Sequence, residues 1–98
     1  MVVNAIVLIK AERGAVNNVA QKIIAVDGVS EVFSVAGRYD LVAILRAKSN
    51  EHVAEIVTQA VQDTQGILDT ETLLAFKAYD REDLEAAFSI GNEEGADS

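Results

Sequence analysis

The stretch SVAGRYDLVAILRA, residues 34–47, determines how the middle of the chain folds. Two apolar runs, residues 30–37 and 41–47, are predicted to be strands because branched apolar residues dominate them. Between them the letters GRYD mark a tight reversal, so the segment is predicted to be a β-hairpin. Gly37 supplies a positive φ, and the carboxylate of Asp40 is suited to accept hydrogen bonds from backbone N–H groups of the turn.

A strand and an amphipathic helix precede this hairpin, and a helix and a strand follow it. Residues 2–11, VVNAIVLIKA, are predicted to form a strand buried on both sides, and residues 15–26 a helix that Gly28 ends. Ser49 is expected to cap the second helix, and residues 67–78, ILDTETLLAFKA, return as the last strand. The apolar residues at helical spacing are Val16, Val19, Ala20, Ile23 and Val26 in the first helix and Val53, Ile56, Val57, Ala60 and Val61 in the second.

The two halves of the chain repeat each other loosely. AIVLIKA (residues 5–11) aligns with LVAILRA (residues 41–47), and each is followed by a helix, a glycine and another strand. Two β-α-β units in tandem predict an α+β, ferredoxin-like βαββαβ sandwich, in which both helices cover one face of a four-stranded antiparallel sheet. Right-handed crossover connections place the first and third strands side by side at its centre.

The second face of this sheet is expected to be apolar as well, although an exposed face normally alternates to polar residues. Leaving several branched apolar side chains in water would forgo on the order of 10 kcal/mol, which is comparable with the whole stability of a domain. We therefore predict that a second copy of the sheet covers this face, in an obligate homo-oligomer built on a face-to-face dimer. The alternating sets are Val3, Ala5, Val7 and Ile9 against Val2, Ile6 and Leu8 in the first strand, and Leu68, Leu74 and Phe76 against Ile67 and Leu73 in the last.

The length of 98 residues suits one domain with a single modest core. Residues 1–79 carry seven Lys/Arg and nine Asp/Glu, a net charge of −2, whereas residues 80–98 carry one Arg and seven acids, a net charge of −6. We therefore expect a domain over residues 1–79 and an acidic C-terminal tail over residues 80–98. The tail is expected to begin with a short helix containing Leu84 and Phe88 and to be disordered from Gly91.

The composition argues against several classes of protein. The nearly neutral body has no basic stripe, so direct binding to nucleic acid is not expected. No apolar run reaches about 18 residues, and the N-terminus lacks the basic start and cleavage site of a signal peptide, so no membrane span is expected. Because the chain contains no cysteine, it has no disulfide or zinc–thiolate site, and a cytoplasmic location is expected.

Few residues favour catalysis. His52 is the only histidine, and we expect it to be a surface residue near the start of the second helix. No spaced cluster of histidine and carboxylates predicts a metal site, and neither a phosphate-binding loop nor a Gly-x-Ser-x-Gly elbow is present. We expect no catalytic residue, no metal and no cofactor.

Two polar features go beyond the requirements of the fold. In the hairpin, Tyr39 is a large side chain with a polar tip, and Arg38 presents a planar donor group suited to carboxylates. In the last strand, Thr70 and Thr72 share one face among apolar residues, although threonine is also simply a good strand residue. Each feature alone has a structural explanation, and their combination is more informative than either.

A Gly-x-Tyr-Asp turn before an apolar strand, in a βαββαβ domain whose last strand carries Thr-x-Thr, resembles the effector domain of the Lrp/AsnC family, often called RAM. The matching segments are GVSEVFSVAG, GRYDLVAILRA and GILDTETLLAF, in this order, and the resemblance runs from about Val2 to Tyr79. Full-length regulators of the family have a helix-turn-helix DNA-binding domain before the effector domain. Here the first strand begins at Val2, so a stand-alone effector domain is expected.

The resemblance implies a dimer formed sheet against sheet, a barrel-like α/β assembly, and the joining of dimers into a ring, typically of four. Small effectors, usually amino acids, would bind where dimers meet. One wall of the pocket would be formed by Gly37, Arg38, Tyr39 and Asp40, and another by Thr70 and Thr72 of a neighbouring subunit. Backbone N–H groups and threonine hydroxyls are suited to an α-carboxylate, and a carboxylate such as Asp40 to the ammonium. The implied function is the regulation of transcription by an amino acid, without catalysis.

Other functions remain open on the sequence. Small cofactor-free enzymes, monooxygenases or isomerases, use the same dimeric α/β fold and line a cavity between sheet and helices with His, Asn, Trp or Tyr. This chain has no Trp and one His. An amino-acid-binding domain of the ACT type shares the topology but does not explain the Gly-x-Tyr-Asp turn. An adaptor that assembles with full-length Lrp/AsnC regulators through the dimer seam is also compatible with the sequence.

Overall fold

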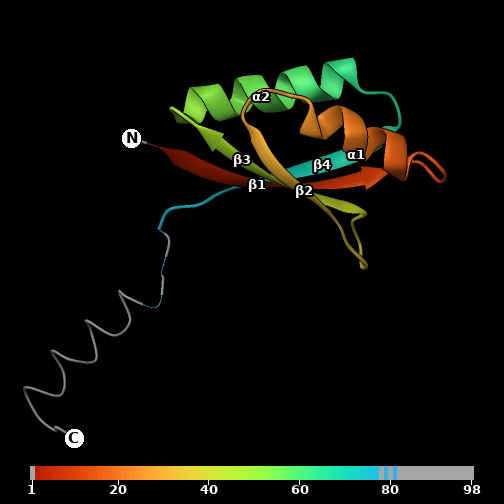
Figure 1. Cartoon of the computed structure of the whole chain (residues 1–98), viewed down its shortest axis with the longest axis horizontal. Helices are drawn as coiled ribbons and strands as arrows, with labels where there is room; N and C mark the ends of the chain where they lie inside the picture. The colour runs from red at the N-terminus through yellow and green to blue at the C-terminus, as the bar shows by residue number, and fades with distance from the viewer. Residues whose placement is uncertain (1, 78, 80, 82–98) are drawn as a thin grey trace, which may run out of the picture.

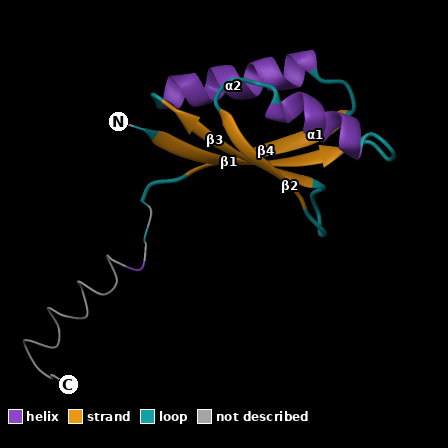
Figure 2. Cartoon of the chain, in the orientation of Figure 1, coloured by secondary structure: helices purple, strands orange, loops and turns teal. Residues whose placement is uncertain are grey.

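The fold is a single sheet with two helices on one of its faces (Figures 1 and 2). A computed structural model describes residues 2–77, 79 and 81. The sheet is antiparallel with the strand order β2-β3-β1-β4, which confirms the predicted ferredoxin-like arrangement with the first and third strands at the centre. The elements are β1 (Val3–Ala11), α1 (Val16–Ile24), β2 (Val29–Ser34), β3 (Leu41–Ala47), α2 (Asn50–Asp63) and β4 (Ile67–Leu74).

The core lies between the sheet and the helices. Along β1 and β3 every second side chain is buried, and these side chains pack against the apolar stripes of both helices. Burial of a branched apolar side chain contributes roughly 1.5–3 kcal/mol, so this layer supplies most of the stability of the domain. The buried apolar residues are Ala5, Val7, Ile9, Ala11, Val19, Ile23, Leu41, Ala43, Leu45, Ala47, Val53, Ile56 and Ala60.

The start of α2 is capped as the sequence predicts. The Ser49 hydroxyl oxygen accepts a hydrogen bond from the backbone N–H of His52 at 3.0 Å. The Nδ1 atom of His52 in turn accepts a bond from the backbone N–H of Lys48, also at 3.0 Å. The only histidine of the chain therefore stabilises a helix terminus, where two donors would otherwise lack partners.

Three element ends differ from the prediction. Helix α1 ends at Ile24 instead of residue 26, because the next N–H groups bond back three residues, from Ala25 to Lys22 and from Val26 to Ile23. Strand β2 ends at Ser34, so the hairpin connection spans the six residues 35–40 and is longer than the predicted tight reversal.

Strand β4 ends at Leu74, although the sequence predicts a strand as far as residue 78. The backbone N–H of Ala75 still donates to the carbonyl of Asn4 at 2.9 Å. Phe76 is 99% exposed, so the residue has no core contact that would prolong the strand. Residue 78 itself lies outside the described residues.

The prediction of which β4 residues share a face is wrong at the beginning of the strand. The register shifts between Lys10 and Ala11, so that Ala11 lies opposite Ile67 while Ile9 lies opposite Thr70. This bulge puts Ile67 on the helix side, the side of Leu74, instead of the opposite face. An irregularity in pairing is not visible in a period-two pattern.

The face away from the helices is apolar at its centre, as predicted. Two rows of paired residues cross it, Phe33–Val42–Leu8–Glu71 and Glu31–Ile44–Ile6–Leu73. None of the described helices and strands lies over this surface (Figure 1). We call it the open face, defined by Ile6, Leu8, Phe33, Val42, Ile44 and Leu73.

The expected acidic tail lies outside the described residues except for Arg81, so its short helix and its disordered end stay predictions, as does the boundary at residue 79. Among the described residues, no helix combines the length and the apolar character needed to cross a membrane.

Substitution of Gly28 tests how closely the turn after α1 packs against the core. Its φ is 97°, and an added Cβ would collide with the buried Ile56 side chain, whereas Gly14 has a φ of 84° and open space around it. We expect Gly14→Ala to cost about 1 kcal/mol through backbone strain alone. Gly28→Ala should cost about 2–4 kcal/mol, because the collision adds to the strain. Urea unfolding of both variants at one protein concentration measures the difference, and equal costs would contradict the packing described.

Candidate ligand-binding site

The hairpin loop of residues 35–40 contains four of the predicted site residues and is held by several hydrogen bonds. It projects from the sheet on the side away from the helices (Figure 1). The backbone N–H of Val35 donates to the carbonyl of Asp40 at 3.0 Å, which closes the loop. The backbone N–H of Asp40 donates to the carbonyl of Ile9 at 2.9 Å, so the loop also rests on the end of β1. Gly37 has a φ of 142°, outside the range that other residues readily adopt.

The Asp40 side chain holds this loop in place. Its Oδ2 atom accepts a hydrogen bond from the backbone N–H of Ala11 at 2.9 Å, and the residue is half-buried. The sequence predicts that Asp40 accepts backbone N–H groups, but within the turn; the observed donor belongs to the last residue of β1, 29 positions away.

Tyr39 reaches across to the edge strand of the sheet. Its hydroxyl donates to Oε1 of Glu71 on β4 at 2.7 Å, although β1 lies between β3 and β4. Lys10 lies opposite Asp69 in the β1–β4 register, and its Nζ donates to the carbonyl of Arg38 at 3.4 Å. These contacts gather two bases, two acids and one phenol at one end of the open face. We call this group the hairpin cluster, formed by Lys10, Arg38, Tyr39, Asp69 and Glu71.

Electrostatics keep the Tyr39 phenol protonated. The hydrogen bond to Glu71 is the largest cause that raises the pKa of Tyr39 above the ordinary value of a tyrosine. Desolvation and the negative charges of Glu71 and Asp69 act in the same direction, and the charge of Arg38 acts against them. Tyr39 is therefore a hydrogen-bond donor at neutral pH, and Glu71 is its acceptor.

Thr70 and Thr72 do not meet the hairpin cluster within one chain. Thr70 lies opposite Ile9 and Thr72 opposite Val7, on the side of β4 that faces the helices, whereas Glu71 faces the other way. Thr72 lines a shallow surface groove between β4 and α2. The other residues along this groove are Asn50, Val53, Ala54, Val57, Thr58 and Leu74. The two parts of the predicted site thus lie on opposite faces of one strand.

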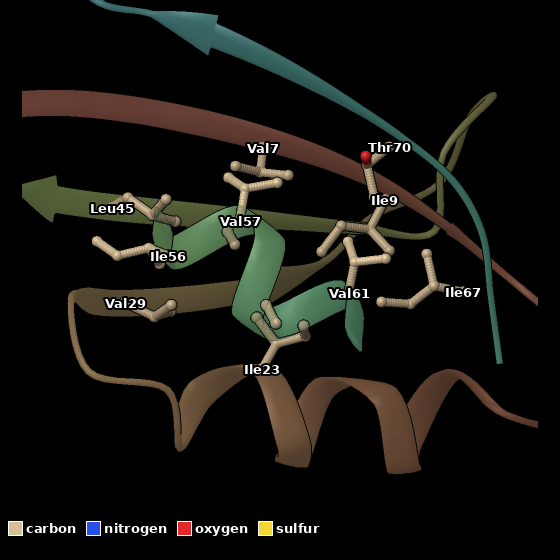
Figure 3. A pocket seen from close by; sticks show the side chains of 12 residues that line it. Val7, Ile9, Ile23, Val29, Leu45, Ile56, Val57, Val61, Ile67 and Thr70 are labelled. Atoms are coloured by element: carbon tan, nitrogen blue, oxygen red, sulfur yellow. The ribbon is translucent and has the colours of Figure 1, made fainter. Parts of the chain in front are cut away.

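The space between sheet and helices is nearly filled. A partly open cavity in this space has a volume of about 20 Å³, and Thr70 is the only polar residue among those that line it (Figure 3). About 10–15 Å³ is enough for one water molecule, so a small substrate does not fit there. The cavity is lined by Val7, Ile9, Ile23, Val29, Ala43, Leu45, Ile56, Val57, Ala60, Val61, Ile67 and Thr70.

Four residues of the loop and two threonines were predicted from the sequence to bind the ligand. Lys10, Asp69 and Glu71 were not predicted. Period-two alternation alone puts Asp69 and Glu71 on the face opposite the threonines, so the pattern contains this signal. Their closeness to Tyr39 depends on the register between β1 and β4, which the pattern does not contain. Within the described residues, no group of three or more His, Cys, Asp or Glu side chains could hold a metal ion.

The Tyr39–Glu71 bond predicts a delayed ionisation of the phenol. In a Tyr79→Phe background, where Tyr39 is the only tyrosine, its tyrosinate absorbance should appear at a higher pH than that of free tyrosine. Glu71→Gln should move the midpoint down, because the carboxylate charge is removed. The stability that this contact supplies is complete below the ordinary tyrosine pKa and is lost as the pH rises through the raised one. An unchanged midpoint in Glu71→Gln would show that the bond is absent in solution.

A family model described as the Lrp/AsnC ligand binding domain matches residues 4–84. Among curated relatives, the HTH-type transcriptional regulator FL11 of Pyrococcus furiosus is 29% identical over 75 residues, which are 76% of this chain and 49% of the relative. The chain spans between 39% and 49% of the length of the curated relatives it matches.

Two solved structures extend the comparison. The protein TTHA0845 from Thermus thermophilus is 43% identical with a TM-score of 0.76, and the match covers 81% of this chain and 99% of that one. The transcriptional regulator NMB0573 of Neisseria meningitidis, solved as a complex with L-Met, matches with a TM-score of 0.70 over 81% of this chain and 53% of its own. At 14% identity this second likeness concerns the fold alone. Because the family model matches most of the described chain, and the fold and the Gly-x-Tyr-Asp loop agree with it, this protein belongs to the Lrp/AsnC ligand-binding domain family.

Proposed function

We propose that this chain is a regulatory, non-enzymatic domain that assembles through its open face and binds an amino acid where two dimers meet. The main support for the proposal is that the predicted site residues lie on two different faces of the sheet. The loop with Tyr39 and the threonines Thr70 and Thr72 lie on opposite faces of β4, so a pocket that uses both needs more than one copy of the chain. The membership of the family supports the same role.

The open face favours a second copy of the sheet as its cover. Its centre consists of half-buried aliphatic side chains, and Phe33 and Leu73 beside them are 49% and 43% exposed. Covering six such side chains would contribute on the order of 5–10 kcal/mol before the costs of association. Charged residues surround this centre, as in the polar rim of a protein interface. They are Lys10, Glu31, Arg46, Asp69 and Glu71.

A separate apolar strip supports contacts between dimers. Along the edge formed by β4 and α2, Val61, Leu68 and Leu74 are all exposed, and Thr72 lies in the groove beside them. Leu74 and Thr72 lie on the helix side of the strand, so this part of the edge stays available when the open face is covered. In the assembly that we propose, dimers meet along this edge and form a ring of four.

The ligand chemistry follows from the groups at such a junction. Backbone N–H groups at the Gly37 turn and the hydroxyls of Thr70 and Thr72 from a neighbouring subunit would hold the α-carboxylate, and Tyr39 and Arg38 would form the opposite wall. The complex of NMB0573 with L-Met supports an amino acid as the ligand, since that protein shares the fold. A ligand at the junction favours one assembly over another and so shifts their populations. Full-length Lrp/AsnC regulators in the cytoplasm are the partners that we propose would sense this shift.

A charge placed at the centre of the open face tests the dimer. Ile44→Glu should convert the assembly to monomers, because two carboxylates would be buried in an apolar contact without partners. Asn17→Glu, at an exposed position of α1, serves as the matched control and should leave the assembly intact. Light scattering at micromolar concentration gives the mass of each. A wild-type chain that is folded and monomeric under these conditions would contradict the proposal.

Removal of the Tyr39 ring tests the ligand site. Tyr39→Ala should weaken the binding of the best ligand from a panel of the twenty L-amino acids by about tenfold or more, because ring contact and hydrogen bond are both lost. Tyr79→Ala removes the other tyrosine, which is exposed outside the loop, and should bind as the wild type does. Isothermal calorimetry measures the affinities, and native mass spectrometry gives the number of bound ligands. Equal binding by the wild type and Tyr39→Ala would remove the loop from the site.

A further inference from the structure

A zwitterionic ligand at the hairpin loop needs an anionic group for its ammonium, and the structure offers three candidates. Asp40 lies in the loop itself, and Asp69 and Glu71 both act on the pKa of Tyr39 from β4. A carboxylate that is already engaged with backbone donors is a poor acceptor for a ligand, because binding would break an existing bond. The hydrogen bonds of the three acids therefore separate them.

Two of the carboxylates are engaged by the backbone. Oδ2 of Asp40 accepts from the N–H of Ala11 at 2.9 Å, in a half-buried position where the loss of this bond would remove one of the contacts that tie the loop to β1. Oδ1 of Asp69 accepts from the N–H of Thr70, also at 2.9 Å, so this side chain is turned toward its own strand. Each of these two carboxylates therefore has one oxygen that is held by the backbone.

Glu71 differs from both in its donor, which is a side chain and not the backbone. Like Asp69 it is exposed, and it accepts a hydrogen bond from the Tyr39 hydroxyl at 2.7 Å. No ion pair joins Glu71 to a lysine or arginine within the described residues. A carboxylate accepts up to about four hydrogen bonds, so one from a phenol leaves its charge uncompensated and most of its capacity unused. The phenol also fixes one oxygen, which limits the rotation of the group.

We propose that Glu71 accepts the ammonium of the ligand, that Tyr39 orients the Glu71 carboxylate, and that Asp40 acts only as a positioning residue for the loop. The proposal rests on the proposed function, and it makes Glu71 the residue that selects amino acids over acids of the same shape without an amino group. The hairpin cluster also contains two bases, Arg38 and Lys10, whose positive charges contrast with the negative charge of Glu71. Charge-assisted hydrogen bonds of this kind are stronger than neutral ones and carry most of the discrimination at a polar site.

The test compares two ligands that differ only in the amino group. The first is the L-amino acid that the wild type binds best from the panel of twenty, and the second is the 2-hydroxy acid with the same side chain. Calorimetry should show that the wild type prefers the amino acid by about tenfold or more. Glu71→Gln, which retains the shape of the side chain, should bind the two ligands equally, mainly because it loses affinity for the amino acid. Glu55→Gln, the same change at an exposed position of α2, should keep the full preference.

Asp40→Asn and Glu71→Asp separate charge recognition from structural support. Asp40→Asn should weaken both ligands alike and lower the melting temperature, so that the preference is kept. Glu71→Asp retains the charge at a shorter reach and should keep part of the preference. Loss of the exposed Tyr39–Glu71 contact should lower the melting temperature only slightly, by less than Asp40→Asn does.

The possible results distinguish this inference from the function on which it rests. If Glu71→Gln still prefers the amino acid as strongly as the wild type does, Glu71 is not the acceptor, and the proposed function stands. If the preference disappears in Asp40→Asn and persists in Glu71→Gln, Asp40 is the acceptor and the inference is wrong. If the wild type binds none of the twenty amino acids, the proposed function fails, and this inference fails with it.

Discussion

One constraint organises this protein: an apolar four-stranded sheet has two faces, and its two helices cover only one of them. The helices bury the alternate residues of β1 and β3 and so form the core. The other residues of the same strands are aliphatic as well, and no described helix or strand covers them. The cost of leaving such a surface wet is comparable with the stability of the domain. This cost is the physical ground on which we propose that copies assemble through the open face and bind a ligand between them.

The hairpin loop shows how one turn serves both the fold and the site. Asp40 is anchored to the end of β1, and this anchor positions the neighbouring residues. Tyr39, a residue that a simple turn does not need, extends to Glu71 on the far side of β1. The loop is therefore tied to β4, the strand that carries the threonines on its other face. In the proposed assembly, a ligand that contacts the loop of one subunit and the threonines of another would link the β4 strands of the two subunits.

The relation to the Lrp/AsnC family agrees with this physical account without replacing it. The family model matches the sequence over the sheet and both helices. The cavity between the sheet and the helices has a volume of about 20 Å³, which is enough for about one water molecule. The polar groups with functional potential lie at the surface instead, at the end of the open face and along the α2–β4 edge. This distribution suits a domain that binds a ligand between subunits.

Local patterns in the sequence determined the elements and their order. The apolar stripe from Val53 to Ala60 and the cap at Ser49 could be predicted because each depends on only a few neighbouring residues. The topology could be predicted because the repeat of two β-α-β units, with right-handed connections, allows one arrangement. The same alternation showed that both faces of the sheet are apolar. The length of the β2–β3 connection, the bulge at Leu68 and the contact of Tyr39 with Glu71 were decided by the tertiary structure alone. They depend on the register between strands that are distant in sequence, and register results from the packing of the whole sheet against its helices, which no single segment contains.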